Sequence, residues 1–239
     1  MTLSPPAPMA QRRTLVTVTT PTISSLLRMI VRGQLALPRP RRPYTWTKSE
    51  GRDLLQAMWE GRDIGSLVIA QLHATPTDAA PDHCAIAFGD CRRASRARPH
   101  SLVIDGQQRL ITLASVCKGL RVEYLSGKRA RFRLAFHPLM GIFAVANAKH
   151  AGSDWLPDVS VVWSSENGVD DALAAYVAQW NATNHVPLGS YGEQRAKRNL
   201  EDLYTLLEGT IAVGEMSSES TPEDWRAQRM ASNKGRGAV

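Results

Sequence analysis

The sequence predicts a domain of the α+β class, in which helices and strands follow one another along the chain. Apolar residues recur at helical spacing in several segments, and short apolar runs typical of strands lie between them. Gly, Pro and Asp separate the two kinds of segment, as expected at turns. The same alternation is also compatible with an α/β arrangement.

The composition indicates a globular protein with a basic balance of charge. The chain has 239 residues and is 43% hydrophobic, which is enough for one large domain or one domain with appendages. Its formal net charge of +7 favours nucleic acid, nucleotides or acidic lipid as partners. A basic composition without any polyanionic partner explains the charge equally well.

The sequence also predicts a cytoplasmic protein without a membrane segment. The N-terminal residues contain no apolar core of a secretory signal, and no apolar run reaches membrane-spanning length. The three cysteines are too few and too irregularly spaced for a disulfide framework. Cys84 and Cys91 follow His83, but this spacing matches no zinc pattern, so we expect no metal site there.

Two helices are predicted in the N-terminal part of the chain. The first has Thr20 as its cap and stops at Gly33, with apolar residues at helical spacing between them. The second starts at Thr47, which has the spacing of a capping box with Glu50, and ends at Gly61. Both helices therefore have a defined start and stop.

A strand, a tight turn and a helix follow in the middle of the sequence. Residues 66–72 read as a buried strand, and residues 100–104 read as a second one. The second strand meets Asp105 and Gly106, which are typical turn residues, and a helix is predicted over 107–120. We expect this strand-to-helix junction to be the functional centre of the protein.

The C-terminal half is patterned more weakly. Residues 131–136 alternate and predict a strand, and residues 210–213 predict a short one. Helices are predicted over 169–180 and 193–208.

From these elements we expect four segments along the chain. They are a flexible leader (1–19), the main domain (20–136), a mixed helical and strand extension of it whose helical part is incomplete (137–214), and a polar tail (215–239).

The junction offers groups that suit phosphate. A helix N-terminus is a ready anion site, and Gly106 lets the backbone approach a ligand closely. Gln107 and Gln108 can each donate and accept hydrogen bonds, and Arg109 offers a planar fork for phosphate oxygens. Asp105 could hold a metal ion, orient water or bond a ribose hydroxyl. An ordinary Asp-Gly turn with Asp105 as a helix cap is the structural alternative.

A second constellation lies in the Pro-rich segment 37–46, whose prolines favour an extended path. Arg42, Tyr44 and Trp46 are candidate nucleotide-binding residues, because arginine binds phosphate and an aromatic ring stacks on a base. Packing against the following helix is the alternative for both aromatic residues, and for Trp46 it is the preferred one.

Residues 103–113 (VIDGQQRLITL) resemble the hallmark of the N-terminal domain of GmrSD-type restriction systems, a domain also found in phosphorothioate-sensing defence proteins. The family pattern is an apolar strand, Asp-Gly-Gln-Gln-Arg and then Leu-Thr-Thr-Leu, and Ile111 stands where Thr is usual. A second family pattern matches at Pro38, Arg42, Pro43, Tyr44 and Trp46, with Arg41 in place of the usual Gln. Ile64 to Leu67 resemble the family's Ile-Gly-Ser-Ile, which adds Gly65 and Ser66 to the candidate nucleotide-binding residues.

The resemblance implies a ParB/sulfiredoxin-like fold with a nucleoside triphosphate site at Asp105–Arg109. It implies hydrolysis with Mg²⁺, in which Arg109, Arg42 and the helix N-terminus bind phosphate. Asp105, Gln107 or Gln108 would position metal or water. Full-length relatives cut DNA with a C-terminal HNH nuclease domain, which we do not expect here because His137 stands without a His/Asn cluster. A separate nuclease subunit is then an expected partner. The base of the nucleotide is not predicted.

Two other interpretations remain open at this point. The chain could be a DNA-binding regulatory module without catalysis, which the charge permits. It could also be the remnant of a larger restriction protein, with a loosely folded second half that proteases would trim beyond about residue 125.

Overall fold

The computed structural model describes most of the chain, with gaps. The described residues are 16–38, 43–72, 99–124, 126–152, 154–217 and isolated positions between 221 and 228. Cys84, Cys91 and the basic run after them lie outside these ranges.

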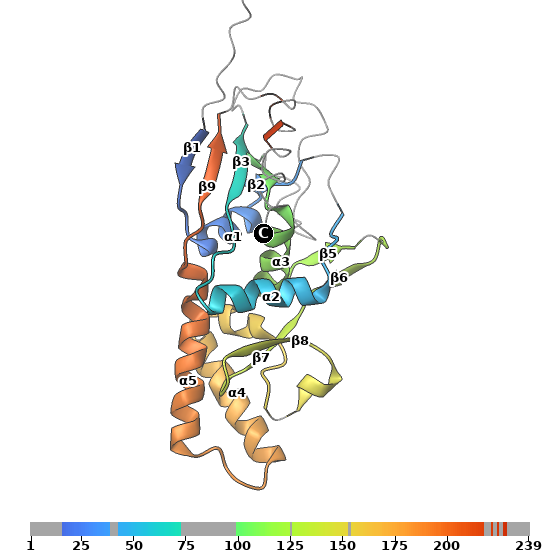
Figure 1. Ribbon diagram of the computed structural model, residues 1–239. Coiled ribbons are helices and arrows are strands. Elements are labelled where there is room, and N and C mark those ends of the chain that lie inside the picture. Colours follow the sequence, from blue (N-terminus) through green and yellow to red (C-terminus); the bar gives the residue numbers. More distant parts are fainter. Residues whose placement is uncertain are drawn as a thin grey trace, which may run out of the picture.

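A five-stranded mixed sheet organises the upper part of the molecule in Figure 1. Its strands are β1 (Val16–Thr19), β2 (Leu35–Ala36), β3 (Leu67–Gln71), β4 (Ser101–Asp105) and β9 (Val213–Met216), in the spatial order β1-β9-β3-β4-β2. The β3 strand runs antiparallel to β4 and parallel to β9. Helices and a mixed sheet confirm the α+β class.

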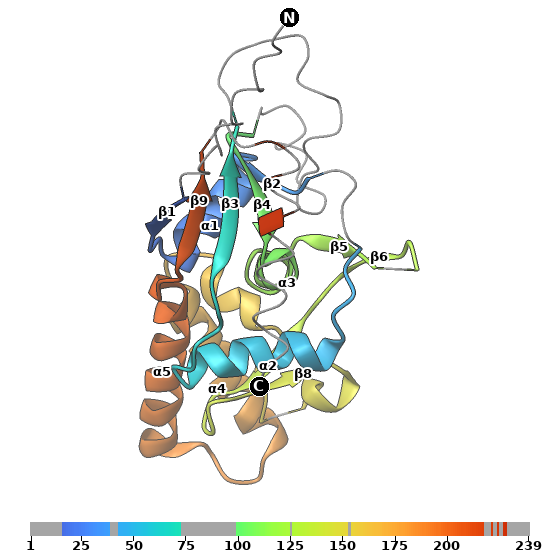
Figure 2. The same cartoon turned by 45° about the horizontal axis from the view of Figure 1, so that its top comes forward.

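The remaining strands form two separate antiparallel hairpins. They are β5 (Arg121–Glu123) with β6 (Arg129–Arg131), and β7 (Leu134–His137) with β8 (Ile142–Val145). The helices are α1 (Ile23–Val31), α2 (Lys48–Trp59), α3 (Gln107–Lys118), α4 (Gly168–Thr183) and α5 (Gly189–Thr205), with short 3₁₀ turns at Ala148–Ala151, Val159–Trp163 and Leu206–Glu208. In both cartoon views α4 and α5 lie side by side below the sheet, and α2 crosses between the two parts (Figures 1 and 2).

The helix signals in the sequence are mostly confirmed. The capping box of α2 is complete, because the Thr47 side chain accepts from the backbone of Glu50 and Glu50 accepts from the backbone of Thr47. The predicted cap of α1 lies two residues too early: Thr22, not Thr20, accepts the hydrogen bond from Ser25 N. Thr20 immediately follows β1, which leaves the cap to the next threonine.

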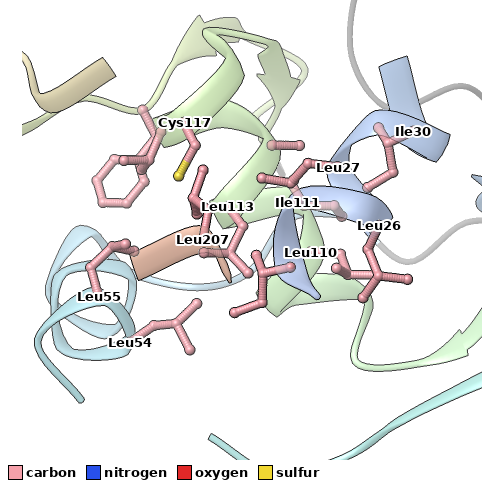
Figure 3. Packing of buried hydrophobic residues seen from close by; sticks show 14 of the residues in the cluster. Leu26, Leu27, Ile30, Leu54, Leu55, Leu110, Ile111, Leu113, Cys117 and Leu207 are labelled. Atoms are coloured by element: carbon pink, nitrogen blue, oxygen red, sulfur yellow. The ribbon is translucent and has the colours of Figure 1, made fainter. Parts of the chain in front are cut away.

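One apolar core joins the two parts of the molecule. Figure 3 shows α1, α2 and α3 turning leucine and isoleucine side chains toward one another, with Leu207 among them. The same cluster includes Leu200 and Leu203 of α5 and Phe136 of β7. The C-terminal helices therefore complete the core rather than lying beside it.

The sheet has two buried faces, as the alternation of side chains along a strand requires. Leu67 and Ile69 of β3 join the main core, whereas Val68 and Ala70 join a second cluster. In β4, Val103 likewise joins the main core, whereas Leu102 and Ile104 join the second cluster. Strands buried on both faces read as continuous apolar runs, which is how 66–72 and 100–104 read in the sequence.

Several predicted strands and boundaries are corrected by the structure. Residues 131–136 span two hairpins, because the chain leaves β6 at Arg131 and starts β7 only at Leu134. The short strand predicted over 210–213 begins at Val213 and continues to Met216, inside the expected polar tail. Four residues of the expected leader form β1, which pairs with β9. The β1 and β9 strands form because they pair with each other from opposite ends of the chain, and a local sequence pattern does not indicate such a partner.

Candidate functional site

The junction between β4 and α3 forms as the sequence predicts. The strand ends at Asp105, Gly106 is the helix cap with φ of 84°, and α3 begins at Gln107. A Cβ atom on residue 106 would lie 2.2 Å from Cδ2 of Leu67, so both the positive φ and the close approach of β3 require glycine. The cap position therefore belongs to Gly106, and Asp105 closes the strand before it.

Arg109 fastens this junction to the loop that leads into β3. Its guanidinium donates to the carbonyl oxygens of Ile64 and Ser66, each at 2.6 Å, and lies 3.9 Å from the Asp105 carboxylate. The residue is only 4% exposed. A planar fork that binds two carbonyl groups holds the loop in one position. The guanidinium is thus turned toward the backbone of this loop, and its expected contact with phosphate stays a prediction.

Gln108 makes a corresponding link to the Pro-rich segment. Its side-chain oxygen accepts from Thr45 N, and its side-chain nitrogen donates to Pro43 O, both at 3.0 Å. An amide that pairs in this way with a backbone N–H and C=O acts like the edge of a strand. The three short patterns picked out in the sequence, around residues 43–46, 64–67 and 103–113, therefore meet at the first turn of α3.

Tyr44 anchors the Pro-rich segment in the core. It is 4% exposed, and its hydroxyl lies 2.8 Å from Oγ1 of Thr112. Burial raises the pKa of Tyr44 to about 12. Its ring meets that of Tyr124 edge-on at 5.5 Å between centroids. Trp46 is partly buried and packs on the main core, so both aromatic side chains are held in packing contacts.

Gln107 carries a buried acceptor at the same place. Its Nε2 atom donates to Val103 O at 2.9 Å. Its Oε1 atom is buried and has no hydrogen-bond partner in the described part of the chain. A buried acceptor without a donor is costly, so water or a ligand group is expected to satisfy it.

An open pocket adjoins the loop that Arg109 holds. It measures about 610 Å³ and is lined by residues 61–66 and 210–212. Gly65 and Ser66, two expected nucleotide-binding residues, belong to its wall. Arg62 and Asp63 also line it and were missed in the sequence, although a charged pair between Gly61 and Gly65 is a recognisable signal. The loop geometry is fixed in part by Asp63, which accepts from Gly65 N at 2.8 Å.

The structure does not place every expected group. Arg42 lies outside the described residues, so its relation to the junction stays a prediction. Within the described ranges, no three His, Cys, Asp or Glu side chains gather as a metal site. No helix in the described ranges is long and apolar enough to span a bilayer.

Comparisons with known proteins bear on the region where these three patterns meet. A search of curated proteins found no match. The family described as GmrSD restriction endonuclease, N-terminal domain, matches residues 23–226, a range that includes the junction, the pocket and both C-terminal helices. The chain therefore belongs to the GmrSD restriction endonuclease N-terminal domain family.

Proposed function

We propose that this chain is a nucleoside triphosphate-binding and hydrolysing regulatory domain of a bacterial restriction system. It would act together with a nuclease domain or subunit that cuts DNA. The observation that carries the proposal is the pocket at residues 61–66, which Arg109 ties to the first turn of α3. Family membership supports the restriction role, and the mixed α+β architecture is compatible with a ParB-like relation.

The size and chemistry of the pocket suit a nucleotide. Its volume of about 610 Å³ falls within the range of small-molecule sites. Arg62 lies in the wall, where its Nε donates to the Glu60 carboxylate at 2.7 Å. Its side chain is 59% exposed, so the other guanidinium N–H groups are within reach of a phosphate group. The first turn of α3 itself contains no acidic residue, and the Asp105 carboxylate just before it lies 3.9 Å from Arg109.

In this proposal the residues of the junction divide into two groups. Gln108 and Arg109 position the binding loops, because backbone groups already occupy their side chains. Gln107 offers its buried Oε1 atom to water or to a ligand hydroxyl. Asp105, whose side chain is 14% exposed, is the candidate for positioning the metal ion or the attacking water.

The donors present fit Mg²⁺ in the way that nucleotide enzymes usually hold it. Such sites use one or two carboxylates together with phosphate oxygens of the substrate, and do not need a cage of protein ligands. Asp105 supplies one carboxylate at the junction. When bound, the ion would offset the negative charge that develops on the phosphates.

The proposal is tested by measuring binding and phosphate release with ATP, GTP, CTP and UTP in the presence of Mg²⁺. Asp105→Asn keeps the shape of the side chain, and we expect it to abolish phosphate release while binding is weakened less. Arg62→Gln should weaken binding about tenfold or more, in line with the loss of a charge-assisted hydrogen bond.

Arg52→Gln is the matched control for Arg62→Gln. Arg52 is also an exposed arginine that pairs with a neighbouring carboxylate, that of Asp53, but it lies away from the pocket. We expect this variant to bind nucleotide like the wild type. A folded wild-type protein that binds none of the four nucleotides would contradict the proposal. Equal effects of the two arginine variants would show that the pocket is not the nucleotide-binding site.

A further inference from the structure

A dense cluster of positive charge lies around one hairpin. Residues 118–133 contain a single acidic side chain, Glu123. They contain six basic ones, Lys118, Arg121, Lys128, Arg129, Arg131 and Arg133. The formal net charge of this short segment is therefore +5. Figures 1 and 2 both show the β5–β6 hairpin extending away from the body beyond α3.

Only two of these six cations have a carboxylate partner in the described part of the protein. Arg129 pairs with Glu123 at 3.1 Å, and Arg131 pairs with Asp158 at 3.0 Å. The other four are exposed to solvent. The hairpin therefore presents a cluster of charges that the protein itself does not neutralise.

This arrangement is unfavourable for the hairpin alone. Arg121 lies directly opposite Arg131 in the strand register, and like charges at such positions are destabilising. The charge pattern thus opposes the fold locally, which indicates that it serves a partner of opposite charge.

The base of the hairpin is nevertheless held firmly against the body. Val122 is 5% exposed, and the backbone N–H of Phe132 donates to the Ser115 hydroxyl of α3 at 2.8 Å. The Tyr124 ring contacts Tyr44, whose hydroxyl lies 2.8 Å from Oγ1 of Thr112 in α3. The exposed cations are therefore carried on a rigid support, which reduces the entropy lost when they bind.

We infer that the β5–β6 hairpin binds the phosphate backbone of duplex DNA through Arg121, Lys128 and their neighbours. The inference rests on the proposed function in one respect, because a component of a DNA restriction system meets duplex DNA. A polyanion with regularly spaced charges is the partner that such a cluster fits, and phosphate contacts of this kind position a protein without reading sequence.

The test is a fluorescence anisotropy titration of a short labelled DNA duplex of mixed sequence, over a series of salt concentrations and without nucleotide. The variant is Arg121→Gln with Lys128→Gln. The matched control is Arg198→Gln with Lys197→Gln, which removes one arginine and one lysine from the exposed surface of α5. Both variants have the same net charge.

We expect the hairpin variant to lose about tenfold or more in affinity, and its slope of log K against log salt to fall by about 1.8 for two lost phosphate contacts. The control should stay within about twofold of the wild type. Equal loss in both variants, or no binding by the wild type, would overturn the inference. Tighter hairpin-dependent binding to a structured RNA of the same length would overturn the assignment to DNA.

Nucleotide binding by the same variants separates this inference from the proposed function. The hairpin variant should bind nucleoside triphosphate like the wild type, because neither residue lines the pocket. A protein that binds DNA through the hairpin but binds no nucleotide would refute the proposed function alone. A protein that binds nucleotide but loses no DNA affinity in the hairpin variant would refute the hairpin inference alone.

Discussion

Arg109 donates a hydrogen bond of 2.6 Å to the carbonyl oxygen of Ser66, a residue 43 positions earlier in the chain. This bond and a second one, from Arg109 to the carbonyl oxygen of Ile64, join the first turn of α3 to the loop before β3. An arginine in the Asp-Gly-Gln-Gln-Arg pattern thus serves the architecture of the site directly.

Arg109→Lys should destabilise the protein although it keeps the charge. An ammonium group cannot bind two carbonyl oxygens with the geometry of a planar fork, so at least one charge-assisted hydrogen bond is lost in a buried place. We expect the free energy of unfolding to fall by about 2–3 kcal/mol, measured by urea denaturation. Arg129→Lys is the control, because that side chain is 61% exposed, and it should change stability by less than about 0.5 kcal/mol. Equal effects of the two changes would mean that the fork of Arg109 has no special structural role.

Gly106→Ala should be more damaging than the same change at another glycine of positive φ. At residue 106 the new Cβ atom would lie 2.2 Å from a methyl group of Leu67, whereas at Gly127 nothing lies within 4 Å. Both variants bear the left-handed backbone penalty of about 1–2 kcal/mol. Only Gly106→Ala adds about 1–3 kcal/mol for the clash. Thermal unfolding of both variants measures the difference, and equal melting temperatures would show that Leu67 moves aside without cost.

The sequence predicted well what depends on neighbours along the chain. Local hydrogen bonds and backbone geometry determine the capping box at Thr47, the turn at Gly106 and the start of α3. The residue types at these positions are therefore enough to predict them. The junction was correctly predicted as a structural feature for the same reason. Its proposed nucleotide chemistry stays a prediction.

Strands and hydrogen bonds whose partners lie far away in the sequence could not be predicted from local patterns. The β1 strand and the end of β9 pair with each other from opposite ends of the chain, and both segments look polar or short in isolation. The hydrogen bonds of Arg109 to Ile64 and Ser66 are also long-range, which is why the guanidinium was expected to face a ligand. Local patterns identify a polar side chain but not its partner.

Tyr44→Phe should remove one buried hydrogen bond between the Pro-rich segment and α3. The Thr112 hydroxyl donates to Gln108 O at 2.9 Å, so its single proton is used and Tyr44 must be the donor in their bond. We expect a loss of about 1–2 kcal/mol in the free energy of unfolding, because the Thr112 oxygen then lacks its donor. Tyr191→Phe, at a residue 77% exposed, should be nearly neutral.

The same variant should also change how stability depends on alkaline pH. Burial raises the pKa of Tyr44 to about 12 from the ordinary value of 10.0, so the unfolded chain loses this proton first as the pH rises. The contribution of Tyr44 is fully present below pH 10.0 and is lost as the pH approaches about 12. Urea denaturation in this window should therefore show a steeper fall for the wild type than for Tyr44→Phe. Parallel curves would mean that Tyr44 ionises equally easily in both states.

A fragment that ends at residue 125 should not fold by itself. It lacks β9, which lies between β1 and β3 and pairs with both. It also lacks Leu200 and Leu203 of α5, which are fully buried in the main core. The remnant interpretation predicts the opposite, since there the second half is loosely folded and easily removed.

Circular dichroism and thermal unfolding of the fragment decide between the two. We expect weak helical signal and no cooperative transition, because removing β9 and α5 exposes apolar residues on both faces of the sheet to water. Adding residues 126–239 as a separate chain should restore part of the cooperative transition by supplying β9 and α5. A fragment that melts cooperatively near the temperature of the whole protein would show that the N-terminal part is an independent domain and would favour the remnant interpretation.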